Sequence, residues 1–322
     1  MTKDVRHDNL RFAAYYAPRG RDRLQWLGES IAQRYLSARD QLIGIMGESG
    51  TGKSSIIRGM FPGLELTNDD EGVNVRPLPL IRMHREEHFT AHTLHIDIRF
   101  EMAFTQPGEM AEAIRAALKQ GKRVVVEHFE EIHPLLKINA QFLMGAGEDI
   151  LVVRPNLFGP FPEDIGKVIN HTAIFRKMAH SAEDIVTMIL EKEYGISKPE
   201  RHGDVPRGFV LQFAKKPSCL DLGRLEERVK AIIQQGVDIS YLDEGHIMIG
   251  KEAYACTGPR IHVRNSSEIR NFRLMKELAY DEMTDSHCLV GLVAEPRALH
   301  FIDRHPDIVP ASVKDLVANS TY

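Results

Sequence analysis

The sequence predicts two domains: an α/β domain with a mainly parallel sheet over residues 1–160, followed by an α+β domain over residues 161–322. Three observations support this division. Expected strands in the first half alternate with amphipathic helices, as in a parallel sheet covered by helices. The segment RPNLFGPFPEDIG, 154–166, carries three prolines and two glycines and indicates a domain boundary. Beyond it, helices and shorter strands follow one another without that alternation.

Length and composition describe an ordinary globular protein. Of the 322 residues, 43% are hydrophobic and 27% charged, which is enough to bury two cores. The formal net charge of −4 argues against nonspecific binding to nucleic acid, but a structured RNA docking on a local patch stays compatible. Three widely spaced cysteines, a polar N-terminus and no long apolar run predict a cytoplasmic protein without a membrane partner. The oligomeric state does not follow from the sequence.

Hydrophobic spacing and turn residues place the elements of the first half. Apolar residues at helical spacing indicate helices, whereas alternation or short apolar runs between turn residues indicate strands. Pro107 and Gly121 fit the start and the end of the clearest helix. The expected elements are a helix at 22–39, strands at 41–46, 94–100 and 149–155, a loop at 62–80, and a helix followed by a strand at 106–129.

The second half is expected to mix helices with short strands. Asp221 is placed to cap the N-terminus of one helix, and Gly195 and Gly236 are placed to end two helices. The expected elements are helices at 180–195 and 221–236, a strand at 208–214, and shorter strands near 246–249, 260–264 and 288–294.

The stretch GESGTGKS, Gly47 to Ser54, satisfies G-x-x-x-x-G-K-[ST] between an expected strand and an expected helix. The glycines let the backbone turn its N–H groups toward phosphate oxygens, and the helix N-terminus adds partial positive charge. Lys53 is expected to reach the outer phosphates and Ser54 to bind Mg²⁺. The motif therefore predicts ATP or GTP binding with Mg²⁺. The expected contact residues are Gly47, Glu48, Ser49, Gly50, Thr51, Gly52, Lys53, Ser54 and Ser55.

A site that transfers or hydrolyses a phosphoryl group also needs an acid near Mg²⁺. Glu127, which ends the strand RVVVE, is the first candidate and Asp97 is the second, although either could be a surface charge at a strand end. Lys53 and Glu127 are therefore the expected catalytic residues. A small-molecule kinase further needs an acid for the acceptor hydroxyl and often a basic lid. No obvious basic lid is present, although three arginines are suitably placed: Arg82, Arg85 and Arg99.

Four histidines lie in the stretch MHREEHFTAHTLH: His84, His88, His92 and His95. On a helix the first three would share a face and form a metal platform. The following residues are expected to form a strand, however, where this spacing scatters the rings. We therefore expect solvated or structural histidines here.

Two segments of the second half combine good zinc ligands. RKMAHSAEDIV places His180 and Asp184 four residues apart, on one face of a helix. ACTGPRIHVRNSSEI brings Cys256 close to His262 across a short loop. Imidazole, carboxylate and thiolate groups from two segments can complete a tetrahedral site. The other interpretation is structural, with an ordinary pair at one helix and a small buried cysteine.

These segments resemble the editing domain shared by alanyl- and threonyl-tRNA synthetases and by free-standing deacylases of mischarged tRNA. That family has H-x-x-x-H on a helix, followed by C-x-x-x-H in a phrase similar to CGGTHV…TGEI, and the resemblance covers roughly residues 165–280. Asp184 stands where the family has its second helix histidine. Alignment on HVRNSSEI makes His262 the last ligand, whereas counting from Cys256 would place Arg260 there.

The resemblance implies Zn²⁺ bound by His180, Asp184, Cys256 and His262, hydrolysis of an aminoacyl ester, and tRNA as a partner. The fusion also resembles bacterial uridine-kinase-like proteins that join an editing-type module to a P-loop module, here in reverse order. An alanyl-tRNA synthetase-related protein without the adenylate-forming core fits this description.

Three functions stay open at this stage. The first is phosphoryl transfer or NTP hydrolysis, with a nucleoside or a tRNA as a further partner. The second is a zinc-dependent deacylase of mischarged tRNA with a regulatory nucleotide site. The third is a nucleotide-dependent binding or sensing module that catalyses nothing.

Overall fold

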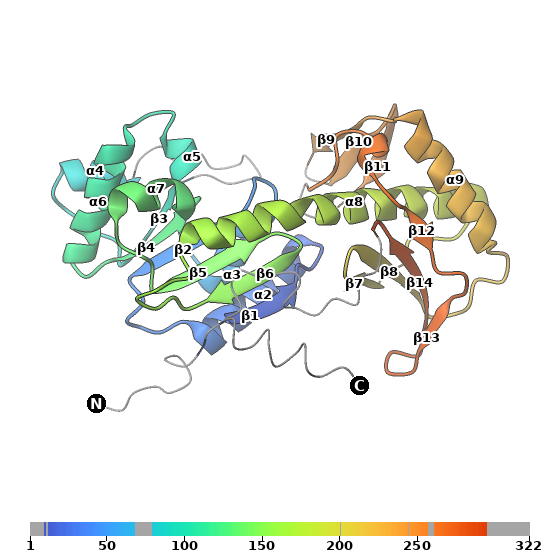
Figure 1. The fold of residues 1–322 in the computed structure, drawn as a ribbon, viewed down its shortest axis with the longest axis horizontal. Helices are drawn as coiled ribbons and strands as arrows, with labels where there is room; N and C mark the ends of the chain where they lie inside the picture. Colours follow the sequence, from blue (N-terminus) through green and yellow to red (C-terminus); the bar gives the residue numbers. More distant parts are fainter. Residues whose placement is uncertain are drawn as a thin grey trace. The chain divides into compact units, whose positions relative to one another are not determined.

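The computed structural model describes residues 10, 12–67, 79–199, 201–243, 245–256 and 261–294. They divide into two compact units (Figure 1). The first unit contains the strand that ends before Ala17 and Arg21–His171, and the second contains Pro18–Gly20 and the described residues from Thr172 onward. The division therefore falls inside a helix rather than in the proline-rich segment before it.

The first unit is built on a six-stranded sheet in the order β1-β6-β5-β2-β4-β3. Strands β2 to β5 are parallel, whereas β6 and β1 are added antiparallel at one edge, so the sheet is mixed. Only two residues join β5 to β6, which enforces a hairpin because a parallel pair needs a long crossover. The strands are β1 (Phe12–Tyr16), β2 (Leu42–Met46), β3 (Thr93–Asp97), β4 (Arg123–Glu127), β5 (Phe142–Ala146) and β6 (Asp149–Val153).

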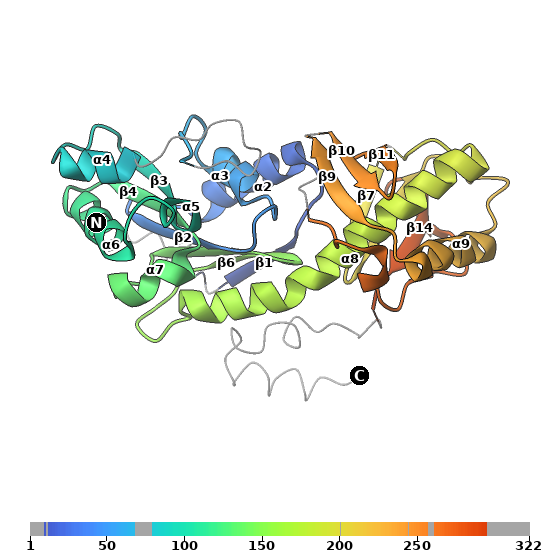
Figure 2. The ribbon, with the colours of Figure 1, turned by 90° about the horizontal axis from the view of Figure 1, so that it is seen from above.

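Six helices described here belong wholly to this unit: α2 (Arg21–Tyr35), α3 (Lys53–Met60), α4 (Pro79–Arg85), α5 (Ile98–Glu101), α6 (Pro107–Lys119) and α7 (Phe129–Leu136). Helices α2 and α3 lie side by side in both ribbon views (Figure 2). Two glycines allow this close approach. A Cβ at Gly28 would lie 2.2 Å from the Ile56 carbonyl oxygen, and one at Gly59 would lie 2.0 Å from the Gln25 carbonyl oxygen.

The second unit has a long helix, two antiparallel sheets and a second helix. Helix α8 (Pro162–Tyr194) begins in the first unit and ends in the second. The sheets have the orders β12-β14-β8-β7, with β13 paired to β14, and β11-β10-β9. The remaining elements are β7 (Arg201–Val205), β8 (Gly208–Phe213), α9 (Leu222–Gln235), β9 (Ile239–Asp243), β10 (His246–Ile249), β11 (Glu252–Ala255), η1 (Ser266–Glu268), β12 (Arg273–Leu274), β13 (Ala279–Asp281) and β14 (Ser286–Leu292).

Most expected elements are present, and their caps have the expected form. The Asp221 side chain accepts a hydrogen bond from the Arg224 N–H at the start of α9, and Gly236 ends α9 with φ 66°. The α/β and α+β classes are confirmed in general terms, and the six-stranded sheet is mostly parallel, with two antiparallel strands at one edge. Most of the loop expected at 62–80 lies outside the described residues.

Three local expectations are wrong. The helix expected at 180–195 is the second half of α8, which begins at Pro162. Pro162 lies in the segment expected to be a domain boundary, but proline is also well tolerated in the first turn of a helix. The strand expected at 94–100 ends at Asp97, whose side chain accepts the Phe100 N–H and so starts α5. The described residues 261–264 form no strand, because the Val263 N–H bonds instead to the Ser181 hydroxyl on α8.

The contact between α2 and α3 gives a stability prediction. We expect Gly59→Ala to lower the free energy of unfolding by about 1–3 kcal/mol, because the added methyl group would collide with backbone. The sole tryptophan, Trp26, lies on α2, so its fluorescence during urea unfolding follows this unit. Gly108→Ala on α6 is the control, since no atom lies within 4 Å of its added Cβ. Equal stability of both variants would contradict the prediction.

Candidate functional sites

The GESGTGKS loop connects the end of β2 to the start of α3. Gly47, Gly50 and Gly52 have φ values of 139°, 80° and 86°, which disfavour residues with side chains. A Cβ at Gly47 would also lie 2.6 Å from the Ala146 carbonyl oxygen. Helix α3 begins at Lys53, so its first N–H groups are at the end of this loop. Gly47, Glu48, Ser49, Gly50, Thr51 and Gly52 lie in the loop, and Lys53, Ser54 and Ser55 form the buried first turn of α3.

Lys53 is fully buried and joins the loop to the neighbouring strand. Its Nζ donates a hydrogen bond to the Glu48 carbonyl oxygen at 2.9 Å and lies 3.5 Å from Glu127 Oε2. Glu127 ends β4, directly beside Ile45 of β2, so the parallel register brings the acid to the loop. Sequence reasoning therefore placed both residues on the correct edge of the sheet.

The charge state of Glu127 follows from its neighbours. Burial acts to raise its pKa, but the Lys53 charge and the hydrogen bond from His95 outweigh burial and lower the pKa to about 2. Glu127 is therefore an ionised carboxylate at neutral pH. An ionised carboxylate that is 1% exposed has to be held by charged or hydrogen-bonding partners.

His95 is one of these partners, which sequence reasoning did not identify. It lies on β3 with its Nε2 3.1 Å from Glu127 Oε1, while its Nδ1 accepts the Thr67 N–H at 3.1 Å. The available signal was its position, two residues before Asp97 on a strand beside the acid. The expectation of solvated or structural histidines is confirmed in both forms, because His95 is buried whereas His88 and His92 are exposed.

The second acid, Asp97, ends β3 next to Glu127. Its Oδ1 accepts the Phe100 N–H, so one oxygen is used as a helix cap. His128 follows Glu127 with φ 56°, a rare conformation for a side-chain-bearing residue. Burial first, and the Lys53 charge second, lower the His128 pKa to about 3. Asp97, Glu127 and His128 have ligand atoms within 4.8 Å of one another.

The three arginines considered from the sequence pair with acids other than Glu127 and Asp97, although the Arg99 charge also helps to lower the His128 pKa. Arg82 pairs with Glu86, Arg85 with Glu109, and Arg99 with Glu131. Among the described residues, His84, His88 and His92 belong to no group of three potential metal ligands. The metal platform on a helix is not formed, because α4 ends at Arg85.

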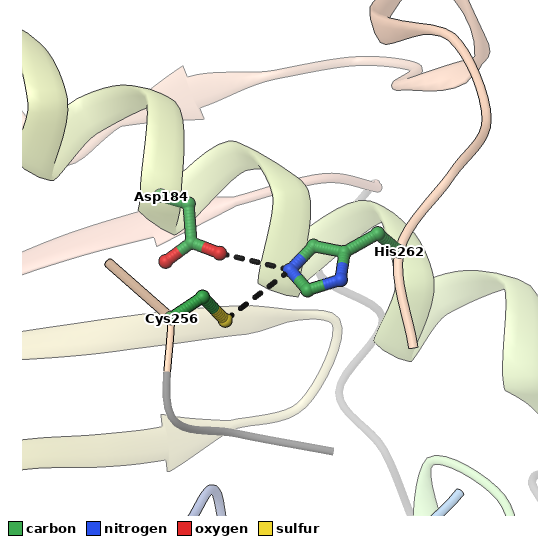
Figure 3. A group of neighbouring side chains, drawn as sticks. All are labelled: Asp184, Cys256 and His262. Carbon is green, nitrogen blue, oxygen red and sulfur yellow. Dashed lines mark hydrogen bonds and ion pairs between the residues drawn. The ribbon is translucent and has the colours of Figure 1, made fainter. Parts of the chain in front are cut away.

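The second group of side chains lies in the second unit. His262 Nε2 is 2.8 Å from Asp184 Oδ2 and 3.7 Å from Cys256 Sγ (Figure 3). The three ligand atoms all lie within 4.8 Å of one another. Asp184 projects from α8, Cys256 follows β11, and His262 belongs to the segment that bonds back to α8 through Val263. Arg260, the alternative to His262, lies outside the described residues.

His180, the fourth expected ligand, lies one turn before Asp184 but outside this group of three. Its ring centroid is 5.5 Å from that of His262, and its buried Nε2 has no hydrogen-bond partner. Burial, together with the charges of Arg19 and other neighbours, lowers its pKa well below the usual value, so the ring is neutral. A neutral imidazole is the form that binds metal.

Asp184 is charged, as a metal ligand requires. Burial acts to raise its pKa, but the hydrogen bond and charge of His262 lower it overall. Sequence reasoning missed a neighbouring group centred on Glu183, which forms an ion pair with Arg19 and a hydrogen bond with His202. Arg19 comes from the segment Pro18–Gly20, which is distant in the sequence and carried no signal of this role.

No protein-family model and no curated protein matches this chain. No helix in the described parts of the chain is both long enough and apolar enough to cross a membrane.

The buried Lys53–Glu127 pair gives a pH prediction. Because the Glu127 pKa is lowered to about 2 from 4.5, its contribution to stability is present above pH 4.5 and is lost as the pH falls toward 2. We expect Glu127→Gln to be less stable than wild type at pH 6, by on the order of 2–3 kcal/mol. This difference should shrink by about 1 kcal/mol at pH 3.5.

Urea unfolding followed by Trp26 fluorescence measures this difference. Glu112→Gln is the control, because Glu112 is an exposed carboxylate on α6. A stability difference that stays constant between the two pH values would contradict the ionised, buried state of Glu127.

Proposed function

We propose that the chain binds a nucleoside triphosphate, ATP or GTP, together with Mg²⁺ at the Gly47–Ser54 loop, and that it transfers or hydrolyses the terminal phosphoryl group. The observation that carries this proposal is the position of Lys53. Its ammonium group is buried between the loop carbonyl of Glu48 and the carboxylate of Glu127. Phosphoryl transfer needs a lysine beside the phosphates and an acid near Mg²⁺, and this position brings the two side chains together at the loop.

The residues present fit a polyanion. Left-handed glycines let the loop backbone present its N–H groups, and a side chain at Gly47 would collide with Ala146. The first turn of α3 supplies further N–H groups and the partial positive charge of a helix N-terminus. Ser54 and Glu127 are the residues that would hold Mg²⁺, directly or through water. Bound Mg²⁺ would neutralise charge on the phosphates.

Lys53 exchanges partners in this proposal. In the structure its Nζ lies 3.5 Å from the Glu127 carboxylate, whereas bound phosphates would draw the ammonium away. Glu127 would then be a buried carboxylate without its lysine, close to further negative charge. Nucleotide affinity should therefore depend strongly on Mg²⁺.

Phosphate binding is tested at Lys53. We expect Lys53→Ala to weaken ATP binding by 10-fold or more, as loss of about 1.4 kcal/mol or more implies, in calorimetric titrations with Mg²⁺. Lys119→Ala, an exposed lysine on α6, is the control and should bind as wild type does. Wild-type affinity in the Lys53→Ala protein would rule out the phosphates at this loop.

The acid is tested separately with Glu127→Gln. We expect turnover to fall by roughly 10²–10⁴-fold while ATP is still bound with Mg²⁺. In buffer without Mg²⁺, this variant should bind ATP more tightly than wild type, because it has no buried carboxylate that loses its lysine to the phosphates. Weaker binding than wild type under that condition would contradict the exchange of Lys53.

Turnover assays with and without nucleosides or deacylated tRNA distinguish a phosphotransferase from an NTPase. A complete lack of turnover would favour the sensing module.

A second candidate function belongs to the second unit: zinc-dependent hydrolysis of an aminoacyl ester, as the resemblance to tRNA editing domains implies. The convergence of a thiol, an imidazole and a carboxylate from α8 and two later segments favours it. Asp184, Cys256 and His262 would hold the metal, and the lone Nε2 of His180 makes it the fourth ligand in this proposal. Bound Zn²⁺ would polarise the ester or lower the pKa of a bound water.

Metal content tests this second candidate. We expect about one Zn²⁺ per chain in purified wild-type protein, as a single site implies, and little in Cys256→Ser and His180→Ala. Cys288→Ser is a matched control, because Cys288 is equally buried but lies on β14 outside the group. Wild-type protein without metal after exposure to Zn²⁺ would exclude the hydrolase.

A further inference from the structure

We propose that His95 is a positioning residue that holds the Glu127 carboxylate in one orientation and so sets which of its oxygens serves the nucleotide site. This inference rests on the proposed function, because it assigns the part of that same site that orients its acid. His95 lies on β3, which β4 separates from β2 and its loop, so in this proposal it acts through Glu127 rather than on the nucleotide.

The hydrogen bonds select the tautomer of His95. The Thr67 backbone N–H donates to Nδ1 at 3.1 Å, so Nδ1 is an acceptor and carries no proton. A neutral imidazole then has its proton on Nε2, which is 3.1 Å from Glu127 Oε1 and donates to it. The Thr67 hydroxyl lies 3.3 Å from the same Nδ1 and can donate to it as well.

The chain of contacts leaves one oxygen of Glu127 for the site. Oε1 accepts the imidazole N–H, whereas Oε2 faces Lys53 at 3.5 Å. All three side chains are at most 2% exposed, so water does not compete for these bonds. Without the imidazole, the carboxylate could rotate and present either oxygen.

Thr67 fixes the far end of the chain. Its hydroxyl oxygen accepts the Asp97 N–H at 3.2 Å, so the same residue binds both His95 and the end of β3. The segment after α3 is thereby tied to the ends of β3 and β4. His95 consequently cannot turn without breaking contacts on both sides, which is what a positioning role requires.

Two substitutions separate positioning from packing. His95→Phe keeps a ring but loses both hydrogen bonds. His95→Gln retains an N–H donor for Glu127 and should restore function. In His95→Phe, we expect the ATP affinity measured with Mg²⁺, or kcat, to fall by about 10–100-fold. In His95→Gln, both quantities should stay within about 3-fold of wild type. ATP affinity without Mg²⁺ should change little in His95→Gln, which keeps a donor for Glu127, and Trp26 fluorescence verifies that both variants are folded.

A second measurement needs no nucleotide. In ¹⁵N NMR of the ligand-free protein, the resonances lost in His95→Gln should show the Nε2–H tautomer, and Glu127→Gln should shift them. The Nδ1–H tautomer would overturn the inference, as would a folded His95→Phe variant with wild-type kcat and Mg²⁺ dependence. Wild-type protein that shows the Nε2–H tautomer but binds no ATP would instead overturn the proposed function, and with it any role of His95 in that site.

Discussion

The buried ion pair between Lys53 and Glu127 is the interaction on which the first unit's site depends. It joins the start of α3 to the end of β4, and its two charges compensate each other where water is excluded. The pair exists because β2 and β4 are neighbours in the parallel part of the sheet, so the loop and the acid come to one edge. Removing either partner would leave the other charge buried without its counter-ion, so both residues have to be present for the pair to be stable. The tight packing of α2 on α3 holds the lysine's helix against this edge.

The candidate metal centre of the second unit follows a different principle. Its ligands project from one long helix and from segments about seventy residues later, and a hydrogen bond between Val263 and Ser181 holds these segments together. A hydrogen bond from His262 keeps Asp184 charged despite its burial, while His180 stays neutral. A charged carboxylate and a neutral imidazole are the forms in which these two side chains bind metal.

The sequence predicts local features of this molecule better than long-range ones. The turn between a strand and a helix at residues 47–52, the strand-end position of Glu127 and the caps Asp221 and Gly236 depend on neighbouring residues and are found as expected. The antiparallel edge of the sheet depends on a two-residue connection that hydrophobic spacing does not show. His95 and Arg19 were missed because their partners are distant in sequence and only the folded backbone brings them together. Of the four expected ligands, three converge, since a one-turn offset on α8 separates His180 from the others.

The short segment Pro18–Gly20 affects how the second unit folds during synthesis and which fragments of the chain contain it whole. It belongs to the second unit although both of its flanks belong to the first, so the second unit is discontinuous in sequence. During synthesis, Arg19 emerges from the ribosome long before its partner Glu183. More than half of the chain has to be made between these two residues before the ion pair can form. A fragment that begins at Thr172 would lack Arg19, so the buried Glu183 carboxylate would lose its cationic partner. A fragment designed to contain the whole second unit therefore has to include Pro18–Gly20 as well as the residues from Thr172 onward.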